Sequence, residues 1–383
     1  MADERNREIK IKLYTSIDNL KDFFYSLSLL KLVHCNGGLG LGVPFSSSFV
    51  AWDFLYADKD KSIAKVEAFT EVFIKGHTLL MDYIVLHKKP QEKWERTTLE
   101  KLLSFISNME EAEKALKCDD TVKESVWMAR FAVHYLSALS ALGDFQFGKS
   151  TTEEKDHCPC PCNHPLIYTD TTIGNPKTWY GKLDVILGSF TSDRQEKKES
   201  PVAVAGIWDE VDDDNECTLD SPGGKCSSLG DHLSHVQSQA IVFSFYQRNR
   251  HQDLNFVPTL AVSRKHIQFH FYDSEKDMFL MSCELPLFRE GDIHLNLCTV
   301  VATWLVVNYK ALMTGATKEM EKEPKFGLHE YFGPVSLDYY KTGIKMAPLQ
   351  PVEMRNTINL AKVQAQKRCL ATEMNESKYQ RRK

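Results

Sequence analysis

The densest group of metal-binding side chains in the sequence lies at residues 157–164, which read His-Cys-Pro-Cys-Pro-Cys-Asn-His. Thiolates and imidazoles are the ligands that zinc prefers in a tetrahedral site. The expected ligands are Cys158, Cys160, Cys162 and His164, and a ligand could also come from elsewhere in the chain. The pattern therefore indicates a site for zinc or another soft metal.

The same segment also fits a solvated or redox-sensitive loop that holds no metal. Its prolines alternate with its cysteines, and proline favours an extended polyproline backbone. Such a backbone would hold the thiols apart and leave them little freedom to surround one ion. Only one residue separates successive cysteines, whereas zinc fingers usually have two or more between paired cysteines. Both interpretations remain open from the sequence.

A second candidate for chemistry is Asp184, which interrupts the apolar run 183–187. A carboxylate in a buried strand costs free energy unless it is hydrogen-bonded, exposed or bound to a metal. Aspartate oxygens are ligands that Mg²⁺ prefers. Asp184 is therefore either a magnesium ligand or part of the exposed face of a strand.

Whole-chain composition limits the class of protein. The chain has 383 residues, of which 43% are hydrophobic and 26% charged, as in ordinary globular proteins. These values exclude a wholly disordered chain, a collagen-like repeat and a coiled-coil rod. The N-terminus has no apolar signal segment, and the longest apolar run, 298–307, has half of the roughly 20 residues that a spanning helix needs. We therefore expect an intracellular protein, cytoplasmic or nuclear, with reduced cysteines and no membrane partner.

Charge is distributed unevenly along the chain. The net charge of −5 does not by itself favour nucleic-acid binding. However, residues 209–220 carry seven acidic side chains and no basic one, which is typical of a solvated loop. From Arg355 onward, eight basic residues stand against two acidic ones, a net charge of +6. The acidic run and the basic tail therefore largely offset each other in the net charge of the whole chain.

Hydrophobic periodicity changes near residue 150, from helical spacing before it to short apolar runs that indicate strands after it. The predicted helices span 17–32, 62–87, 97–116, 121–142, 233–250 and 292–312, and the predicted strands span 183–187, 202–207, 256–262, 266–272 and 278–283. We expect a helical N-terminal region (1–118), an α/β core (119–315) with disordered insertions near 150–165 and 189–235, and a C-terminal extension with a basic tail (316–383).

Four segments of the core carry a family resemblance. They are Trp-Tyr-Gly-Lys-Leu-Asp at 179–184, Ser-Pro-Gly-Gly-Lys at 221–225, the helix 239–251, and Phe-Tyr-Asp-Ser-Glu at 271–275. With these, the chain over 120–315 resembles a large set of uncharacterised invertebrate proteins that are abundant in molluscs. The order of helix, Asp-bearing strand, second strand, Gln-bearing helix and further strands is also similar to the core of PD-(D/E)XK nucleases.

This resemblance implies an α+β fold with a restriction-endonuclease-like mixed sheet flanked by helices. In such nucleases an Asp and a Glu bind a divalent ion, and a Lys two residues after the Glu orients the attacking water. Asp184 matches the Asp, and Gln239 matches the helix position that faces the site. The place of Glu-x-Lys reads Cys-Ser-Ser-Leu-Gly-Asp-His at 226–232, and the strand 202–207 also lacks both residues. An intact metal site would need substitutes such as Asp209, Glu210 or Asp231.

The resemblance therefore predicts a catalytically degenerate nuclease-like domain that acts as a binding or regulatory module. Its partner would be nucleic acid, contacted through Arg248, Arg250, His251 and the basic tail, or a protein. Two alternatives remain. One is an active Mg²⁺-dependent phosphodiesterase with a rearranged site, and the other is a structural or partner-binding protein built on the helical N-terminal half.

Overall fold

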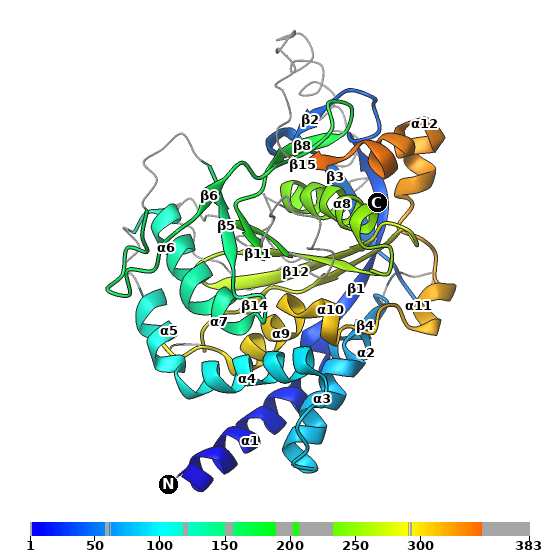
Figure 1. The fold of residues 1–383 in the computed structure, drawn as a ribbon. Coiled ribbons are helices and arrows are strands. Elements are labelled where there is room, and N and C mark those ends of the chain that lie inside the picture. Colours follow the sequence, from blue (N-terminus) through cyan, green and yellow to red (C-terminus); the bar gives the residue numbers. More distant parts are fainter. Residues whose placement is uncertain are drawn as a thin grey trace.

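The computed structural model describes residues 2–57, 61, 63–117, 122–149, 156–188, 202–206, 233–289, 291 and 293–346 (Figure 1). Several sequence features lie outside the described residues. They are the acidic run 209–220, the segment 221–232 with the substitutes proposed there, and the basic tail from Arg355. The described residues form an α+β fold.

One mixed sheet runs through the molecule, with the described strands in the order β3-β1-β13-β12-β11-β10-β9-β5-β6, while β4 pairs with β1 and β14 with β12. A smaller sheet has the order β15-β7-β8-β2. The strands are β1 (Ser26–Cys35), β2 (Val43–Pro44), β3 (Val50–Phe54), β4 (Val66–Ala68), β5 (Phe145–Gly148), β6 (Tyr168–Thr169), β7 (Thr172–Gly174), β8 (Trp179–Lys182), β9 (Val185–Leu187), β10 (Val202–Gly206), β11 (Val257–Val262), β12 (His266–Asp273), β13 (Met278–Ser282), β14 (Leu285–Pro286) and β15 (Lys345–Met346).

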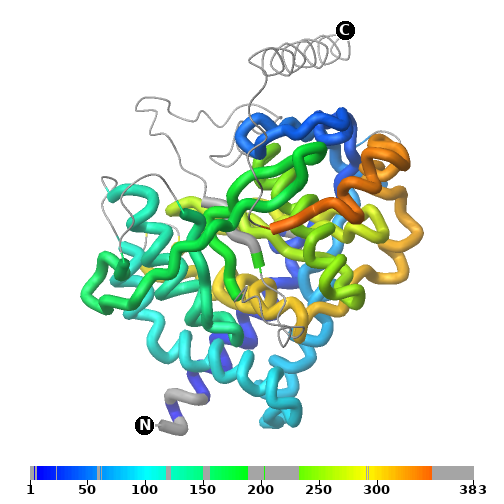
Figure 2. Tube along the Cα trace, turned by 45° about the horizontal axis from the view of Figure 1, so that its top comes forward, coloured from blue at the N-terminus to red at the C-terminus, as the bar shows by residue number. Residues whose placement is uncertain are grey.

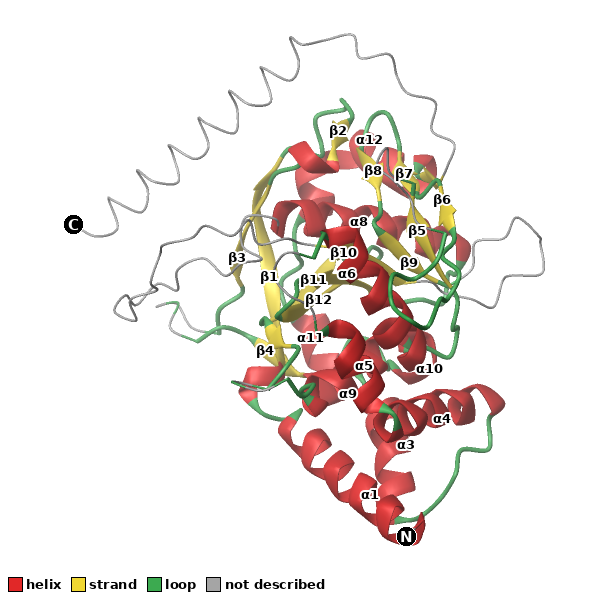
Figure 3. Ribbon diagram, turned by 90° about the vertical axis from the view of Figure 1, so that its left-hand side faces the viewer, coloured by secondary structure: helices red, strands yellow, loops and turns green. Residues whose placement is uncertain are grey.

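Helices cover both faces of the main sheet, with α8 and α12 on one side and the larger group of α1, α3, α4, α9 and α10 on the other (Figure 3). The helices are α1 (Ala2–Asn19), α2 (Phe69–Val72), α3 (Ile74–Val85), α4 (Lys93–Ser107), α5 (Met109–Leu116), α6 (Glu124–Phe131), α7 (Ser137–Leu139), α8 (Leu233–Arg250), α9 (Leu297–Val307), α10 (Tyr309–Leu312), α11 (Lys318–Lys322) and α12 (Leu328–Gly343). Two 3₁₀ turns, η1 (Phe23–Tyr25) and η2 (Phe45–Ser47), and a π-helical segment, η3 (Ala132–Leu136), complete the described elements.

The apolar run 298–307 forms the buried helix that the sequence predicts. Asn296 caps α9, because its side-chain oxygen accepts hydrogen bonds from the backbone N–H groups of Cys298 and Thr299. Trp304 is fully buried, and its indole donates to the carbonyl of Thr98 on α4 at 2.7 Å. The helix thus joins the sheet to the outer helical layer. No helix among the described residues has both the length and the apolar character that crossing a membrane requires.

The centre of the main sheet has a simple connectivity. Strands β5, β9 and β10 pair antiparallel in that order, and α8 then crosses over to β11, which lies parallel to β10. The predicted helix 233–250 and the predicted strands at 202–207, 256–262, 266–272 and 278–283 are confirmed within a residue or two at their ends. These elements can be predicted from the sequence because their apolar residues keep one period over a long stretch that is bounded by turn residues.

The helix predicted over 17–32 is wrong in its second half, because residues 26–35 form β1. The leucines of this segment fit helical spacing, but Leu27 and Leu29 also alternate with polar residues at the period of a strand. Pairing decides between the two, since β1 lies between β13 and β3, antiparallel to both. The N-terminal region therefore contributes to the main sheet as well as to the helical layer.

Segments from opposite ends of the described chain lie side by side at the top of the molecule (Figure 2). The hydroxyl of Tyr340 on α12 donates to the carbonyl of Gly37 at 3.1 Å and accepts from the backbone N–H of Trp179. A Cβ atom on Gly37 would lie 2.6 Å from the Trp179 ring, so only glycine fits there. The glycine-rich loop after β1 is thus a packing surface for α12.

His270 on β12 makes the fold sensitive to acid. It is fully buried, and burial lowers the pKa of its imidazole from 6.5 to about 3. Below about pH 6.5, His270 binds a proton in the unfolded chain but not in the folded chain. The free energy of unfolding therefore falls by up to about 1.4 kcal/mol for each unit by which the pH is lowered. We expect urea denaturation at pH 7, 6 and 5 to show this slope. His270→Gln should flatten it, and the exposed control His87→Asn should not. An unchanged slope in His270→Gln would contradict the assignment.

Candidate metal centre

His134 is positioned by a π-helical segment in the helical run 124–139. Trp127, Phe131 and Tyr135 stack on the core side of this run, with 4.9 Å between successive ring centroids. His134 follows Phe131 in the π turn and is only half-buried. π-helical turns are rare and often occur at functional sites. The aromatic stack thus holds the helix in place while the imidazole remains accessible.

The cysteine segment forms a tight turn rather than an extended chain. The backbone N–H of Cys158 donates to the carbonyl of His164 at 2.7 Å, and His157 bridges to Pro165. Asn163 adopts a left-handed conformation, with φ of 50°, which asparagine tolerates better than most residues. The expectation that the prolines would hold the thiols apart is therefore wrong, because the turn reverses the chain within a few residues.

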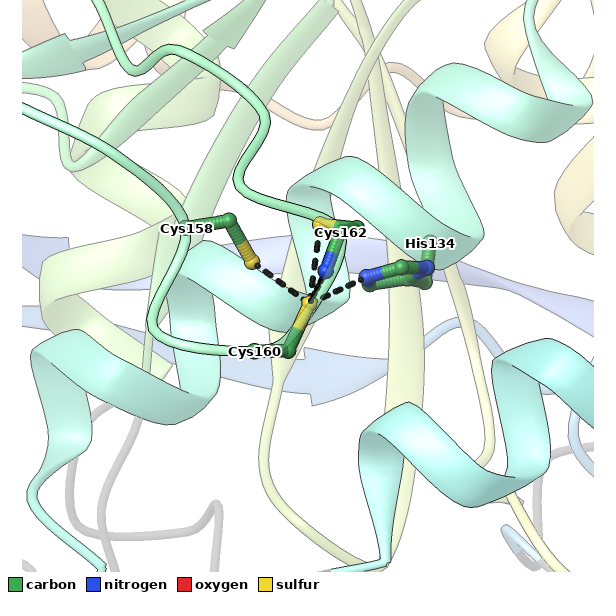
Figure 4. A group of neighbouring side chains, drawn as sticks. All are labelled: His134, Cys158, Cys160 and Cys162. Atoms are coloured by element: carbon green, nitrogen blue, oxygen red, sulfur yellow. Dashed lines mark hydrogen bonds between the residues drawn. The ribbon is translucent and has the colours of Figure 1, made fainter.

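This turn places three sulfur atoms beside the imidazole of His134 (Figure 4). The Sγ atom of Cys160 lies 3.3 Å from that of Cys158, 2.8 Å from that of Cys162 and 3.1 Å from Nε2 of His134. All four ligand atoms lie within 4.8 Å of one another. Zinc–sulfur bonds of 2.3 Å imply sulfur–sulfur edges of about 3.8 Å in a tetrahedron. We call these four residues the Cys/His cluster. Shifts of the ligand atoms by about 1 Å or less would let them surround one ion.

The electrostatics of the Cys/His cluster differ from thiol to thiol. Burial raises the pKa of Cys158 to about 12 and also raises that of Cys162. Burial acts in the same direction on Cys160, but hydrogen bonds from Cys162 and Cys158 and the charge of Arg130 outweigh it and lower its pKa. Burial lowers the pKa of His134, which favours the neutral imidazole that binds metals. The central thiol is thus the one most ready to become a thiolate.

His164 occupies a different place from the one that the sequence suggested. Its ring is exposed and stacks on Phe145, with 5.7 Å between centroids, and it is not a member of the Cys/His cluster. His134 supplies the imidazole instead, from a segment more than twenty residues earlier in the chain. The sequence indicated that a ligand could come from elsewhere, but a histidine in a helix carries no signal that identifies it.

Asp184 lies at a bend between β8 and β9, and its side chain is exposed. Its carbonyl accepts a hydrogen bond from the backbone N–H of Gly148 at 2.9 Å. The part of the chain that the structure describes contains one group of His, Cys, Asp or Glu that could hold a metal, and Asp184 does not belong to it. Gln239 is fully buried on α8 and donates to the carbonyl of Lys182 at 3.3 Å, two residues before Asp184. Helix α8 thus contacts the end of β8 through Gln239.

The three residues expected to contact nucleic acid do not form one surface. The guanidinium of Arg248 pairs with Glu275 and donates to the carbonyl of Leu254. His251 is buried. Arg250 is exposed, with its guanidinium carbon 5.6 Å from the centroid of the Tyr246 ring. Only Arg250 therefore presents its charge openly to solvent.

The Cys/His cluster offers three sulfur ligands and one nitrogen ligand, the donor set of a closed structural zinc site. The six cysteines within the described ranges are all free thiols, so these sulfurs are available to a metal. No protein-family model, curated protein or solved structure matches the chain.

Proposed function

We propose that this chain is a zinc-binding module without nuclease activity, in which zinc fastens the turn 156–166 to the helical run 124–139. One observation carries the proposal: the ligand atoms of His134, Cys158, Cys160 and Cys162 lie within 4.8 Å of one another although they come from separate segments. Unrelated thiols on a solvated loop have no reason to converge on a helical imidazole.

A structural role fits the ligand set better than a catalytic one. Catalytic zinc sites keep a fourth position open for water or substrate, whereas structural sites have four protein ligands. The Cys/His cluster supplies four. Cys158 is buried and anchors the site to the core, while Cys162 is exposed. The metal would therefore close the turn onto the helix and leave no place for a reacting molecule.

The connectivity of the main sheet supports a nuclease-like origin for the module. The strand that follows Asp184 (β9), the second strand β10, the Gln239-bearing helix α8 and the further strands β11 to β13 come along the chain in the order that the resemblance implies. Asp184 directly precedes β9, and the neighbouring strand β10 reads Val-Ala-Val-Ala-Gly, with neither a carboxylate nor a lysine. The acid–base pair of a metal-dependent nuclease is thus missing from the strand beside Asp184, which favours a binding role over cleavage.

The test is metal analysis of protein purified without chelators at pH 7.5. We expect about one zinc ion per chain. Acidification should release it, because the cysteine thiols must be deprotonated and the imidazole must be neutral to bind the metal. Protein without stoichiometric zinc would refute the site. Cleavage of nucleic acid that depends on Mg²⁺ or Mn²⁺ and is abolished by Asp184→Ala would refute the non-catalytic role.

A further inference from the structure

A hollow lies on the surface where the C-terminal end of α8 meets the end of α12 and strand β15. Its volume is 540 Å³, within the usual range for sites that bind small molecules. Two apolar side chains and six polar or aromatic residues line it; the latter are Tyr246, Asn249, Arg250, Lys341, Thr342 and Lys345. We call this hollow the basic pocket.

The charge of the basic pocket has one sign. Arg250, Lys341 and Lys345 are exposed cations that line it, and no carboxylate is among its lining residues. Within the described residues, none of the three forms an ion pair. Like charges gathered around one hollow repel each other until an anion enters it. The arrangement thus favours a negatively charged occupant.

Favourable interactions with helix dipoles explain only part of this clustering of cations. Arg250 and Lys341 lie in the last turns of α8 and α12, where cations interact favourably with the helix dipole. Lys345 lies on strand β15, opposite Gly174 of β7 and two residues beyond the end of α12. Two parts of the chain that are distant in sequence, the end of α8 and residues 341–345, thus bring their cations to the same hollow, which a dipole effect does not require.

The remaining lining residues suit a ligand that carries both a phosphate and a ring. Tyr246 is half-buried, and its ring lies beside the Arg250 guanidinium. Aromatic faces next to cations bind nucleobases by stacking, and guanidinium groups bind phosphate oxygens in pairs. The Thr342 hydroxyl donates to the carbonyl of Asp338 at 2.9 Å, so its oxygen can still accept a hydrogen bond.

We propose that the basic pocket binds a phosphate-bearing ligand of about mononucleotide size, with Arg250, Lys341 and Lys345 contacting the phosphate and Tyr246 contacting the base. The pocket shares no residue with the Cys/His cluster. The inference therefore goes beyond the zinc proposal and does not depend on it. Nucleotides and nucleic-acid strands share this phosphate chemistry, so the experiment separates these two sources.

The experiment is isothermal titration of the full-length, metal-analysed protein with AMP, inorganic phosphate and a six-nucleotide single-stranded DNA. We expect saturable binding of at least one of these probes, weakened by salt because ion contacts carry it. Lys345→Glu should reduce the affinity at least tenfold. The matched control Lys89→Glu changes the net charge equally, on the loop after α3, and should leave the affinity within twofold.

The pattern among the probes identifies the source. Preference for AMP supports a free nucleotide, preference for the oligonucleotide supports a nucleic-acid strand, and binding of phosphate alone supports the cation contacts without the Tyr246 contact. Absence of binding to all three probes, or equal loss in Lys345→Glu and Lys89→Glu, would overturn the proposal. Thermal melting and zinc content of each variant show whether it is folded, so a failed zinc site cannot be mistaken for a failed pocket.

Discussion

Replacing Cys158 by serine is expected to lower zinc affinity more than about 100-fold, since outer-shell changes alone commonly cost 10- to 100-fold. Cys158 is the buried ligand, 3% exposed, so its loss also detaches the turn from the core. At a free zinc concentration of about 1,000 times the Kd, the metal stabilises the native protein by about 4 kcal/mol, and the variant should lose this gain. Competition with a chromophoric chelator measures the affinity, and thermal melting with and without zinc measures the stability.

The two histidines provide a matched control for this result. His134→Asn removes the imidazole of the Cys/His cluster, whereas His164→Asn removes the exposed imidazole that stacks on Phe145. We expect the first to release zinc and the second to retain it. Retention by His134→Asn together with loss in His164→Asn would mean that the turn binds metal in a different arrangement. The pair thus tests the structural assignment against the one made from the sequence.

Replacing Asp277 by alanine is expected to lower the free energy of unfolding by about 3 kcal/mol, the scale of leaving several buried donors unpaired. Its carboxylate accepts from the Tyr272 hydroxyl at 2.8 Å and from the backbone N–H groups of Gly327 at 3.0 Å and His329 at 3.1 Å. It thereby joins the β12–β13 turn to the start of α12. Alanine also tolerates the φ of 52° at this position poorly.

The control for this position is Asp277→Asn. Asparagine keeps one side-chain oxygen and accepts a left-handed backbone, so we expect it to lose less than half as much stability as alanine. Tyr272→Phe, which removes only the hydroxyl, should cost about 1 kcal/mol. Chemical denaturation of the three variants measures these differences. A cost below about 0.5 kcal/mol for alanine would show that water replaces the carboxylate and that Asp277 does not anchor α12.

The sequence predicts those parts of the fold in which one periodicity persists. Helix α8, strands β11 to β13 and the buried helix α9 belong to this class, because their apolar faces are long and their ends carry turn residues. Strand β1 belongs to another class. Its leucines satisfy both periods, and only its pairing with β13 and β3 selects the strand.

The metal centre shows the same division between local and long-range information. Cys158, Cys160 and Cys162 are conspicuous in the sequence because they lie together. His134 is not, because its proximity to them depends on how the helical run 124–139 packs against the turn. The left-handed conformation of Asn163 reverses the chain direction. The alternating prolines indicate an extended backbone instead, so this turn could not be predicted from the sequence. The three cysteines of the cluster were therefore readable from the sequence, and the histidine was not.

The position of β1 within the sheet also determines when the protein can finish folding. Leu27 pairs with Ser282, so a strand near the start of the chain has to wait for one synthesised much later. Contacts between such distant residues close large loops and slow the folding of a chain. Until then β1 would present the strand edge that pairs with β13, and unpaired strand edges are prone to associate with other chains. This edge of β1 thus stays unpaired until residue 282 has been made, and no fragment that ends before β13 can complete the sheet.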